Sequence, residues 1–258
     1  MRKYRSWCCE GRRKRVAKVL VTGSAGGVGL GVCRALLAAG HDVTGFDLRP
    51  SEPGVHSVIG DITDRELVRN AIAGNDMVIH LAATPDEADF LGELLEPNVR
   101  GLFHICDGAR TEQIKRLVLA SSVQVVSGHS WRQTIQIEDG PRVVNHYALT
   151  KLWLESMGEM YARVFGMVVI AARLGWLPRS PEHAAELLAS PTGTDVYLSH
   201  DDAGRFFRAC VEQKMEPGQF ETLFATSKPA TQTRIDLSHT TKVLGYEPQD
   251  TWPSGHAF

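Results

Sequence analysis

The 258-residue chain has few cysteines, little net charge and no long apolar run, and each shortage excludes a class of protein. Five cysteines, an odd number without a Cys-x-x-Cys pair, argue against a disulfide framework and against a zinc ribbon. The longest aliphatic run, residues 167–172, is far shorter than a membrane span. A net charge of −2 argues against a general nucleic-acid binder, and the ten histidines form no His-Glu-x-x-His or similar metal motif. The composition, 43% hydrophobic and 22% charged, is that of an ordinary globular protein.

Positive charge is nevertheless concentrated at the N-terminus. Residues 1–18 carry a net charge of +7, and the rest of the chain carries −9. We interpret residues 1–15 as a basic, disordered leader, and because it lacks an apolar core we do not expect a secretory signal. The scattered cysteines then indicate a reduced, cytoplasmic protein. The alternative is a tether to a membrane surface or a nucleic acid, with acylation at Cys8 or Cys9.

Short apolar runs alternate with stretches of helical periodicity through residues 16–175. This alternation predicts βαβ units and a Rossmann-type, doubly wound α/β fold whose parallel sheet is covered on both faces. Residues 176–258 are punctuated by prolines and are expected to form a small substrate-binding lobe that completes the same fold. The expected strands are 16–22, 42–46, 54–59, 77–81, 116–121, 167–173 and 220–224, and the expected helices are 26–40, 64–73, 86–110, 147–165, 181–190 and 201–213.

A glycine-rich turn joins the first expected strand to the first expected helix. Gly23, Gly26 and Gly29 follow a G-x-x-G-x-x-G pattern, with Gly27 and Val28 between them. Glycines at the start of a helix let backbone amides approach a dinucleotide pyrophosphate, so the turn predicts a cofactor site. The alternative is a tight turn without a ligand.

Acidic residues follow the next two expected strands. Asp47 ends the second strand, where its carboxylate can accept both ribose hydroxyls of adenosine and repel a 2′-phosphate. This favours NAD over NADP, although Arg49 nearby could accept that phosphate. Asp61 and Ile62 follow the third strand and are expected to lie beside the adenine.

Tyr147 and Lys151 lie four residues apart on one face of an expected helix. A phenol is a weak base at neutral pH, but a nearby ammonium favours its phenolate form and lowers its pKa. Ser122, just past the fifth expected strand, could orient a substrate oxygen. The alternatives are a half-buried aromatic for Tyr147 and a solvated side chain for Lys151.

These features together resemble the extended short-chain dehydrogenase/reductases of the NAD-dependent epimerase/dehydratase type. The resemblance implies that Ser122, Tyr147 and Lys151 form the catalytic triad, and that Asn98 supports the lysine through a water. Asn98 could otherwise be a polar residue of helix packing. The resemblance also places Leu81, Ala82 and Ala83 at the cofactor. The motifs that carry it are Thr22-Gly23-x-x-Gly26-x-x-Gly29, Asp61-Ile62, His80-Leu81-Ala82-Ala83, Asn98-Val99-x-Gly101, Ser121-Ser122 and Tyr147-x-x-x-Lys151.

Within that family the chain is most similar to uronate dehydrogenases, which oxidise the C1 hydroxyl of a sugar acid to a lactone with NAD. By this resemblance Ser122, Val123, Gln124 and Arg173 would bind the substrate, and Arg173 would pair with its carboxylate. Arg173 could instead be an interior arginine paired with a structural carboxylate. Val123 and Gln124 depart from the Asn-His that uronate dehydrogenases tend to have. The segments that carry the similarity are 173–175, 197–202, 236–238 and 244–250.

Two other functions stay open: a sugar epimerase or dehydratase that retains its cofactor, and a regulatory protein that binds NAD without catalysis. Because only residues 176–258 remain for a lid, a small sugar or sugar acid is favoured over a nucleotide sugar. The family commonly forms dimers through two long helices, here 86–110 and 146–165, so we expect a homo-oligomer.

Overall fold

The computed structural model describes residues 16–255 and contains a seven-stranded parallel sheet. The predicted leader, with Cys8 and Cys9, lies outside the described residues. The strand order is β3-β2-β1-β4-β5-β6-β7, and every neighbouring pair is parallel. The strands are β1 (Lys18–Thr22), β2 (Asp42–Asp47), β3 (His56–Ile59), β4 (Met77–His80), β5 (Arg116–Ser122), β6 (Val168–Leu174) and β7 (Phe220–Ala225).

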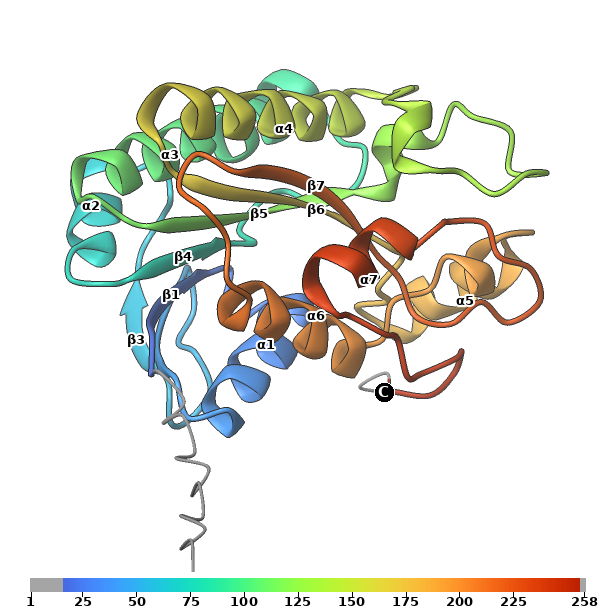
Figure 1. The fold of residues 1–258 in the computed structure, drawn as a ribbon, viewed down its shortest axis with the longest axis horizontal. Helices are drawn as coiled ribbons and strands as arrows, with labels where there is room; N and C mark the ends of the chain where they lie inside the picture. Colours follow the sequence, from blue (N-terminus) through green and yellow to red (C-terminus); the bar gives the residue numbers. More distant parts are fainter. Residues whose placement is uncertain (1–15, 256–258) are drawn as a thin grey trace, which may run out of the picture.

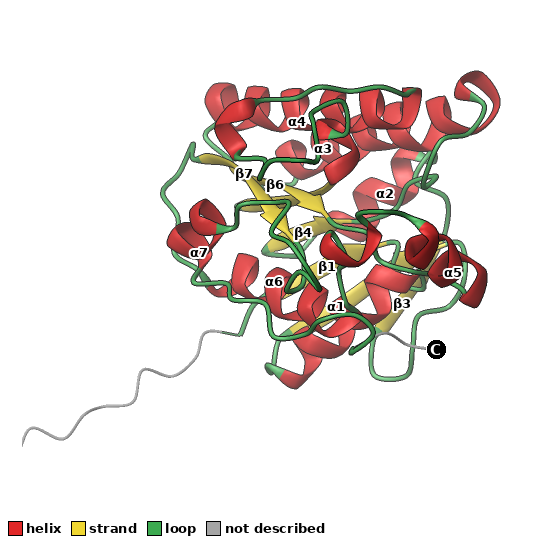
Figure 2. Ribbon diagram, turned by 90° about the vertical axis from the view of Figure 1, so that its right-hand side faces the viewer, coloured by secondary structure: helices red, strands yellow, loops and turns green. Residues whose placement is uncertain are grey.

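Helices cover both faces of the sheet. Figure 1 shows α3 and α4 on one side and α1 and α6 on the other, and Figure 2 shows the same three layers after a quarter turn. The α-helices are α1 (Gly27–Ala38), α2 (Arg65–Ile72), α3 (Leu102–Thr111), α4 (His146–Phe165), α5 (Pro181–Ala189), α6 (His200–Glu212) and α7 (Ser238–Leu244). The π-helical segment η1 (Phe90–Gly101) precedes α3, and short 3₁₀ turns are η2 (Val123–Val126), η3 (Ile137–Asp139) and η4 (Gly193–Asp195).

Side-chain alternation along each strand separates two apolar clusters. Val19 and Val21 of β1 pack in the cluster that includes residues of α1 and α6, whereas Leu20 packs in the cluster with α2, α3 and α4. Successive residues of a strand point to opposite faces, so a sheet covered on both faces needs an almost continuous apolar run. All residues of β5 and β6 are buried, in agreement with this requirement.

The predicted fold is confirmed, and each expected strand is present. One expected helix is wrong: residues 86–110 do not form a single helix. The chain remains a loop until Asp89, whose side chain accepts a hydrogen bond from the Gly92 amide at 2.6 Å. Pro97 inside η1 has no amide to donate, and the segment makes wider turns than an α-helix. Helix α7 was not expected, because its seven residues are too short for a periodic pattern.

The C-terminal part of the chain contributes to the same sheet. Strand β7 pairs with β6, and helix α6 packs against α1 on one face. No described helix is both long and apolar enough to cross a membrane. The strand order reverses between β1 and β4, and ligands of open α/β sheets bind at such a point, outside the carboxyl ends of the strands.

Candidate active site

A single continuous cleft of about 1300 Å³ lies at the carboxyl ends of the central strands. The glycine turn after β1 lines it, and so do Ser122 at the end of β5 and Tyr147 and Lys151 on α4. Pockets for one small ligand usually have ~300–1000 Å³, so this volume suits a cofactor together with a small substrate.

The glycine turn brings three backbone segments into close contact. Gly23 has a φ of +72°, and a Cβ added there would lie 2.7 Å from the Ala82 amide nitrogen. A Cβ added to Gly29 would lie 2.1 Å from the Gly23 carbonyl oxygen. Helix α1 starts at Gly27 without a side-chain cap from the described residues, so its first amides remain available to an anion.

Asp47 lies at the end of β2 and lines the cleft. Its carboxylate accepts hydrogen bonds from the amides of Ala25 at 3.0 Å and Arg49 at 3.1 Å. The Arg49 guanidinium donates to the Ala25 carbonyl at 3.0 Å, so it lies beside the same turn. The other predicted cofactor residues that line this cleft are Gly23, Gly26, Gly27, Val28, Gly29, Asp61, Ile62, Leu81, Ala82 and Ala83.

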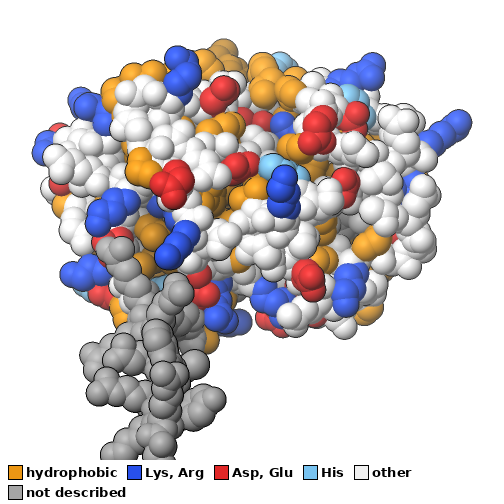
Figure 3. Space-filling model, viewed as in Figure 1, with side chains coloured by type: hydrophobic (Ala, Val, Ile, Leu, Met, Phe, Trp, Pro, Cys, Tyr) orange, Lys and Arg blue, Asp and Glu red, His pale blue; other side chains and the backbone are white. Residues whose placement is uncertain are grey.

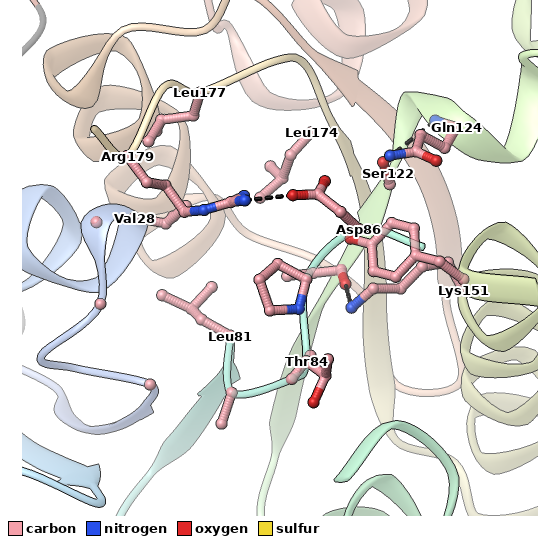
Figure 4. A pocket seen from close by; sticks show the side chains of 18 of the residues that line it. Val28, Leu81, Thr84, Asp86, Ser122, Gln124, Lys151, Leu174, Leu177 and Arg179 are labelled. Carbon is pink, nitrogen blue, oxygen red and sulfur yellow. Dashed lines mark hydrogen bonds and ion pairs between the residues drawn. The ribbon is translucent and has the colours of Figure 1, made fainter. Parts of the chain in front are cut away.

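Helix α4 orients Tyr147 and Lys151 into the cleft. Asn145 caps the helix, accepting a hydrogen bond from the Ala148 amide at 2.7 Å, which fixes where its first turn begins. The Lys151 ammonium donates to the Ala120 carbonyl of β5 at 3.0 Å and lies 5.5 Å from the centre of the Tyr147 ring. The Ser122 hydroxyl accepts from the Gln124 amide at 3.1 Å. Figure 4 shows Ser122, Gln124 and Lys151 around the same end of the cleft.

Burial dominates the titration of these groups. It raises the pKa of Tyr147 above its usual value, and the Asp86 carboxylate raises it further, while the Ser122 hydrogen bond and Arg179 lower it. Burial lowers the pKa of Lys151 to about 8. Burial, together with the Lys151 charge, lowers the pKa of His80 to about 3, so His80 is neutral. The groups that lower the tyrosine pKa are thus Ser122 and Arg179 rather than the expected lysine, and desolvation outweighs them.

Asn98 is buried in η1 and joins two parts of the site. Its side chain exchanges hydrogen bonds with both backbone groups of Thr84, at 2.8 and 3.0 Å, and donates to the Thr150 hydroxyl at 3.3 Å. Thr150 in turn donates to the Tyr147 carbonyl at 2.8 Å. Asn98 therefore contacts the loop after β4 and helix α4 rather than Lys151 directly.

Arg173 does not line the cleft, so its position contradicts the prediction that it binds the substrate. Its guanidinium makes two hydrogen bonds of 2.8 Å to the Glu155 carboxylate, and the two side chains are only 4% and 7% exposed. The Ser121 hydroxyl also donates to Glu155, at 2.6 Å. Strand alternation explains the error, because the next residue, Leu174, lines the cleft and Arg173 points to the opposite face, toward α4.

Val123 and Gln124 both line the cleft but differ in character. Val123 packs in an apolar cluster with Trp131 and Trp176. The Gln124 side-chain oxygen accepts from the side-chain NH₂ group of Asn145 at 2.9 Å, and the NH₂ group of Gln124 has no partner among the described residues. Gln124 can therefore donate to a bound hydroxyl.

Several cleft residues were not predicted from the sequence. They belong to none of the motifs from which the site was predicted, and they are Thr84, Asp86, Glu93, Ser127, Trp131, Asn145, Trp176, Arg179, His183 and Glu186. Asp86 and Arg179 form an ion pair across the cleft (Figure 4). Only the position of Asp86, shortly after a predicted strand, could have indicated it.

Comparison with known proteins identifies the family of this chain. Residues 19–177 match the family described as the NAD dependent epimerase/dehydratase family. The chain is 28% identical over 251 residues to an L-arabinose 1-dehydrogenase (NAD(P)(+)) of Haloferax volcanii, covering 91% of this chain and 97% of that protein. It is 26% identical over 238 residues to a uronate dehydrogenase of Pseudomonas putida, covering 91% and 84%. The crystal structure of uronate dehydrogenase from Agrobacterium tumefaciens superposes with a TM-score of 0.76 at 25% identity, covering 91% of this chain and 85% of that one. The resemblance predicted from the motifs is confirmed.

Proposed function

The chain belongs to the NAD dependent epimerase/dehydratase family, and we propose that it is an oxidoreductase that oxidises a hydroxyl of a small sugar or sugar acid. The observation that carries the proposal is one cleft with a glycine turn at one end and Ser122, Tyr147 and Lys151 at the other. The relatives named as an L-arabinose 1-dehydrogenase and a uronate dehydrogenase support oxidation at C1, from hemiacetal to lactone.

The cofactor end of the cleft fits NAD. Backbone approaches that a Cβ would block, at Gly23 and Gly29, suit a pyrophosphate at the start of α1. The Asp47 carboxylate suits the adenosine ribose hydroxyls. When bound, oxidised NAD supplies the hydride acceptor and a positive charge near the reacting carbon.

The chain's own residues handle the proton. Ser122 orients the substrate hydroxyl, and Tyr147 in its phenolate form takes the proton as the hydride leaves the same carbon. The Lys151 ammonium, held by the Ala120 carbonyl, favours that phenolate. Both a neutral sugar and a sugar acid are compatible with this step, because they differ at a carbon remote from C1.

The decisive test is release of NADH from purified protein incubated with NAD and a panel of uronates, neutral aldoses and nucleotide sugars. Tyr147→Phe should lower kcat by orders of magnitude while NAD binding persists. Tyr161→Phe is the matched control, because Tyr161 lies on the same helix outside the cleft and should change little. Substrate conversion without free NADH would support an epimerase, and NAD binding without any conversion would support a regulatory protein.

We also propose a homodimer formed through η1, α3 and α4. These elements expose Leu91, Phe103, Leu149 and Trp153, whose exposed fractions lie between 46% and 73%. In Figure 3, hydrophobic atoms gather along the upper edge, where Figure 1 has α3 and α4. Exposed apolar side chains on neighbouring elements are typical of an interface. Trp153→Glu should convert a dimer to a monomer in sedimentation velocity, and a monomeric wild type would contradict the proposal.

A cytoplasmic location and the absence of a nucleic-acid partner remain parts of the proposal. Three cysteines, Cys33, Cys106 and Cys210, are buried free thiols, which suits a reducing compartment. Cell fractionation with NADH-forming activity in the membrane or secreted fraction would contradict the location. Salt-sensitive retention on duplex DNA would contradict the second expectation.

A further inference from the structure

The substrate end of the cleft contains an ion pair whose partners come from distant parts of the chain. Arg179 precedes α5, and its guanidinium donates to the carboxylate of Asp86 in the loop after β4 (Figure 4). Their side chains are 38% and 46% exposed, so both remain accessible from the cleft. An arginine that already has a carboxylate partner is not free to bind a second one without displacing the first.

The other positive charges are also engaged. Of the described residues that line the cleft, only Lys151 and Arg179 are lysine or arginine. Lys151 donates to the Ala120 carbonyl and lies beside Tyr147. Arg173, which is the arginine expected to bind a substrate carboxylate, is buried against Glu155 outside the cleft.

Several acidic side chains, by contrast, line the cleft. Glu93, Glu96 and Glu186 line the cleft in addition to Asp86. Glu96 pairs with Arg100, but the Glu93 and Glu186 carboxylates have no cationic partner among the described residues. An anionic substrate would therefore lose hydration without gaining a cation.

The remaining lining groups suit an uncharged polyhydroxylated ring. The Gln124 NH₂ group and the Ser127 hydroxyl can bond to sugar hydroxyls. Val123, Trp131 and Trp176 add apolar surface. Pockets that combine apolar walls with a few polar groups bind neutral small molecules.

Arg179 has one other possible anionic partner. A Cβ added to Gly27 would lie 3.5 Å from the Arg179 side chain, so the stem of this arginine passes over the start of α1. A cofactor pyrophosphate at that helix start could share the guanidinium with Asp86. Because a guanidinium has five N–H donors, removing Asp86 would still release some of them from this shared arrangement.

We propose that this cleft takes an uncharged sugar rather than a sugar acid, and that the Asp86–Arg179 ion pair sets this specificity. The inference rests on the proposed dehydrogenase function. Asp86 pairs with Arg179, which is the one arginine among the described residues that line the cleft. The charge of Asp86 also repels a substrate carboxylate at that place.

The test compares substrates that differ only at C6. Galactose and galacturonate form one matched pair, glucose and glucuronate a second, and kcat/KM is measured from NADH formation. We expect each neutral sugar to exceed its acid by about tenfold or more, since one unfavourable charge contact is worth about one factor of ten. NADH formation with both sugars, but faster with the acid, would overturn the inference and leave the proposed function intact. No NADH from any sugar would overturn both.

A second experiment removes the carboxylate that pairs with Arg179. In Asp86→Asn, Arg179 loses its partner, so the acid-to-neutral ratio of kcat/KM should rise about tenfold. Any effect of the substitution on Tyr147 applies to both substrates, so it cancels in this ratio. Glu93→Gln is the matched control, because it removes the same unit of charge from the cleft wall without freeing an arginine, and it should leave the ratio nearly unchanged. The KM for NAD is measured in both variants, and an unchanged ratio in Asp86→Asn, with or without a change in that KM, would overturn the role of the ion pair.

Discussion

Glu155→Gln should destabilise this protein more than any surface charge substitution. Glu155 receives two 2.8 Å hydrogen bonds from Arg173 and one of 2.6 Å from Ser121, in a site where both charged side chains are almost fully buried. Neutralising the glutamate leaves the Arg173 guanidinium buried without a counter-charge. Breaking such a pair by changing one partner costs about 3–5 kcal/mol. For a protein of this size that corresponds to a fall in Tm of about 6–20 °C.

The assay is urea unfolding followed by circular dichroism, with the midpoint and slope fitted separately. A lower midpoint with an unchanged slope is expected. The matched control is Glu112→Gln, because the Arg69–Glu112 pair is exposed and solvent screens it, so its midpoint should hardly move. The double variant Glu155→Met with Arg173→Met should recover much of the lost stability, since no unpaired charge remains. A midpoint for Glu155→Gln that matches the control, or a double variant no more stable than the single one, would refute this reasoning.

Three further predictions concern the cofactor and pH. Gly29→Ala should abolish NAD binding in isothermal titration, because its Cβ would lie 2.1 Å from the Gly23 carbonyl oxygen, and a Kd within about twofold of wild type would contradict this. Asp47→Ala should lower the NAD-to-NADP ratio of kcat/KM about tenfold or more, and an unchanged ratio would remove Asp47 from cofactor selection. Activity should rise with pH, because burial holds the pKa of Tyr147 above its usual value and the phenolate is the base. The rise should flatten above pH 8, where Lys151, with a pKa of about 8, loses its charge, and a maximum in acid would contradict both assignments.

Local patterns in the sequence were enough to predict most of the fold. The central strands β1, β4, β5 and β6 are mainly apolar runs, since both faces of the sheet are covered there, and these runs were recognisable, whereas the edge strand β3 is mostly exposed. The turn at Gly23 was also predictable, because a strand, closely spaced glycines and a helix follow one another within a few residues. The failure at residues 86–110 has a local cause that apolar periodicity does not register, namely a capping aspartate at Asp89 and a proline at Pro97.

The candidate site likewise has one part that local sequence patterns predict and another part that they do not. Tyr147 and Lys151 share a helix, and Ser122 ends β5, so spacing and strand order suffice to bring them together. A shift of one residue along β6 would turn the Arg173 side chain to the other face of the sheet. Its partner Glu155 lies on a separate helix, α4. Periodicity in the sequence predicts that such a strand is buried, but not which charged group lies opposite each of its faces.

The charge of the substrate site depends on contacts between charged residues from separate elements, which periodicity in the sequence does not predict. Asp86 and Arg179 are 93 residues apart in the chain, and neither belongs to a regular element. Counting arginines near the site would favour an anionic substrate, because Arg173 lies at the end of the sixth strand and Arg179 follows it closely. The structure pairs each with a carboxylate, Glu155 for one and Asp86 for the other, so that neither is left for a ligand. Affinity for an anion depends on unpaired positive charge in the folded cleft, and we therefore expect Asp86→Asn to change the choice of substrate more than any change of arginine number on the surface.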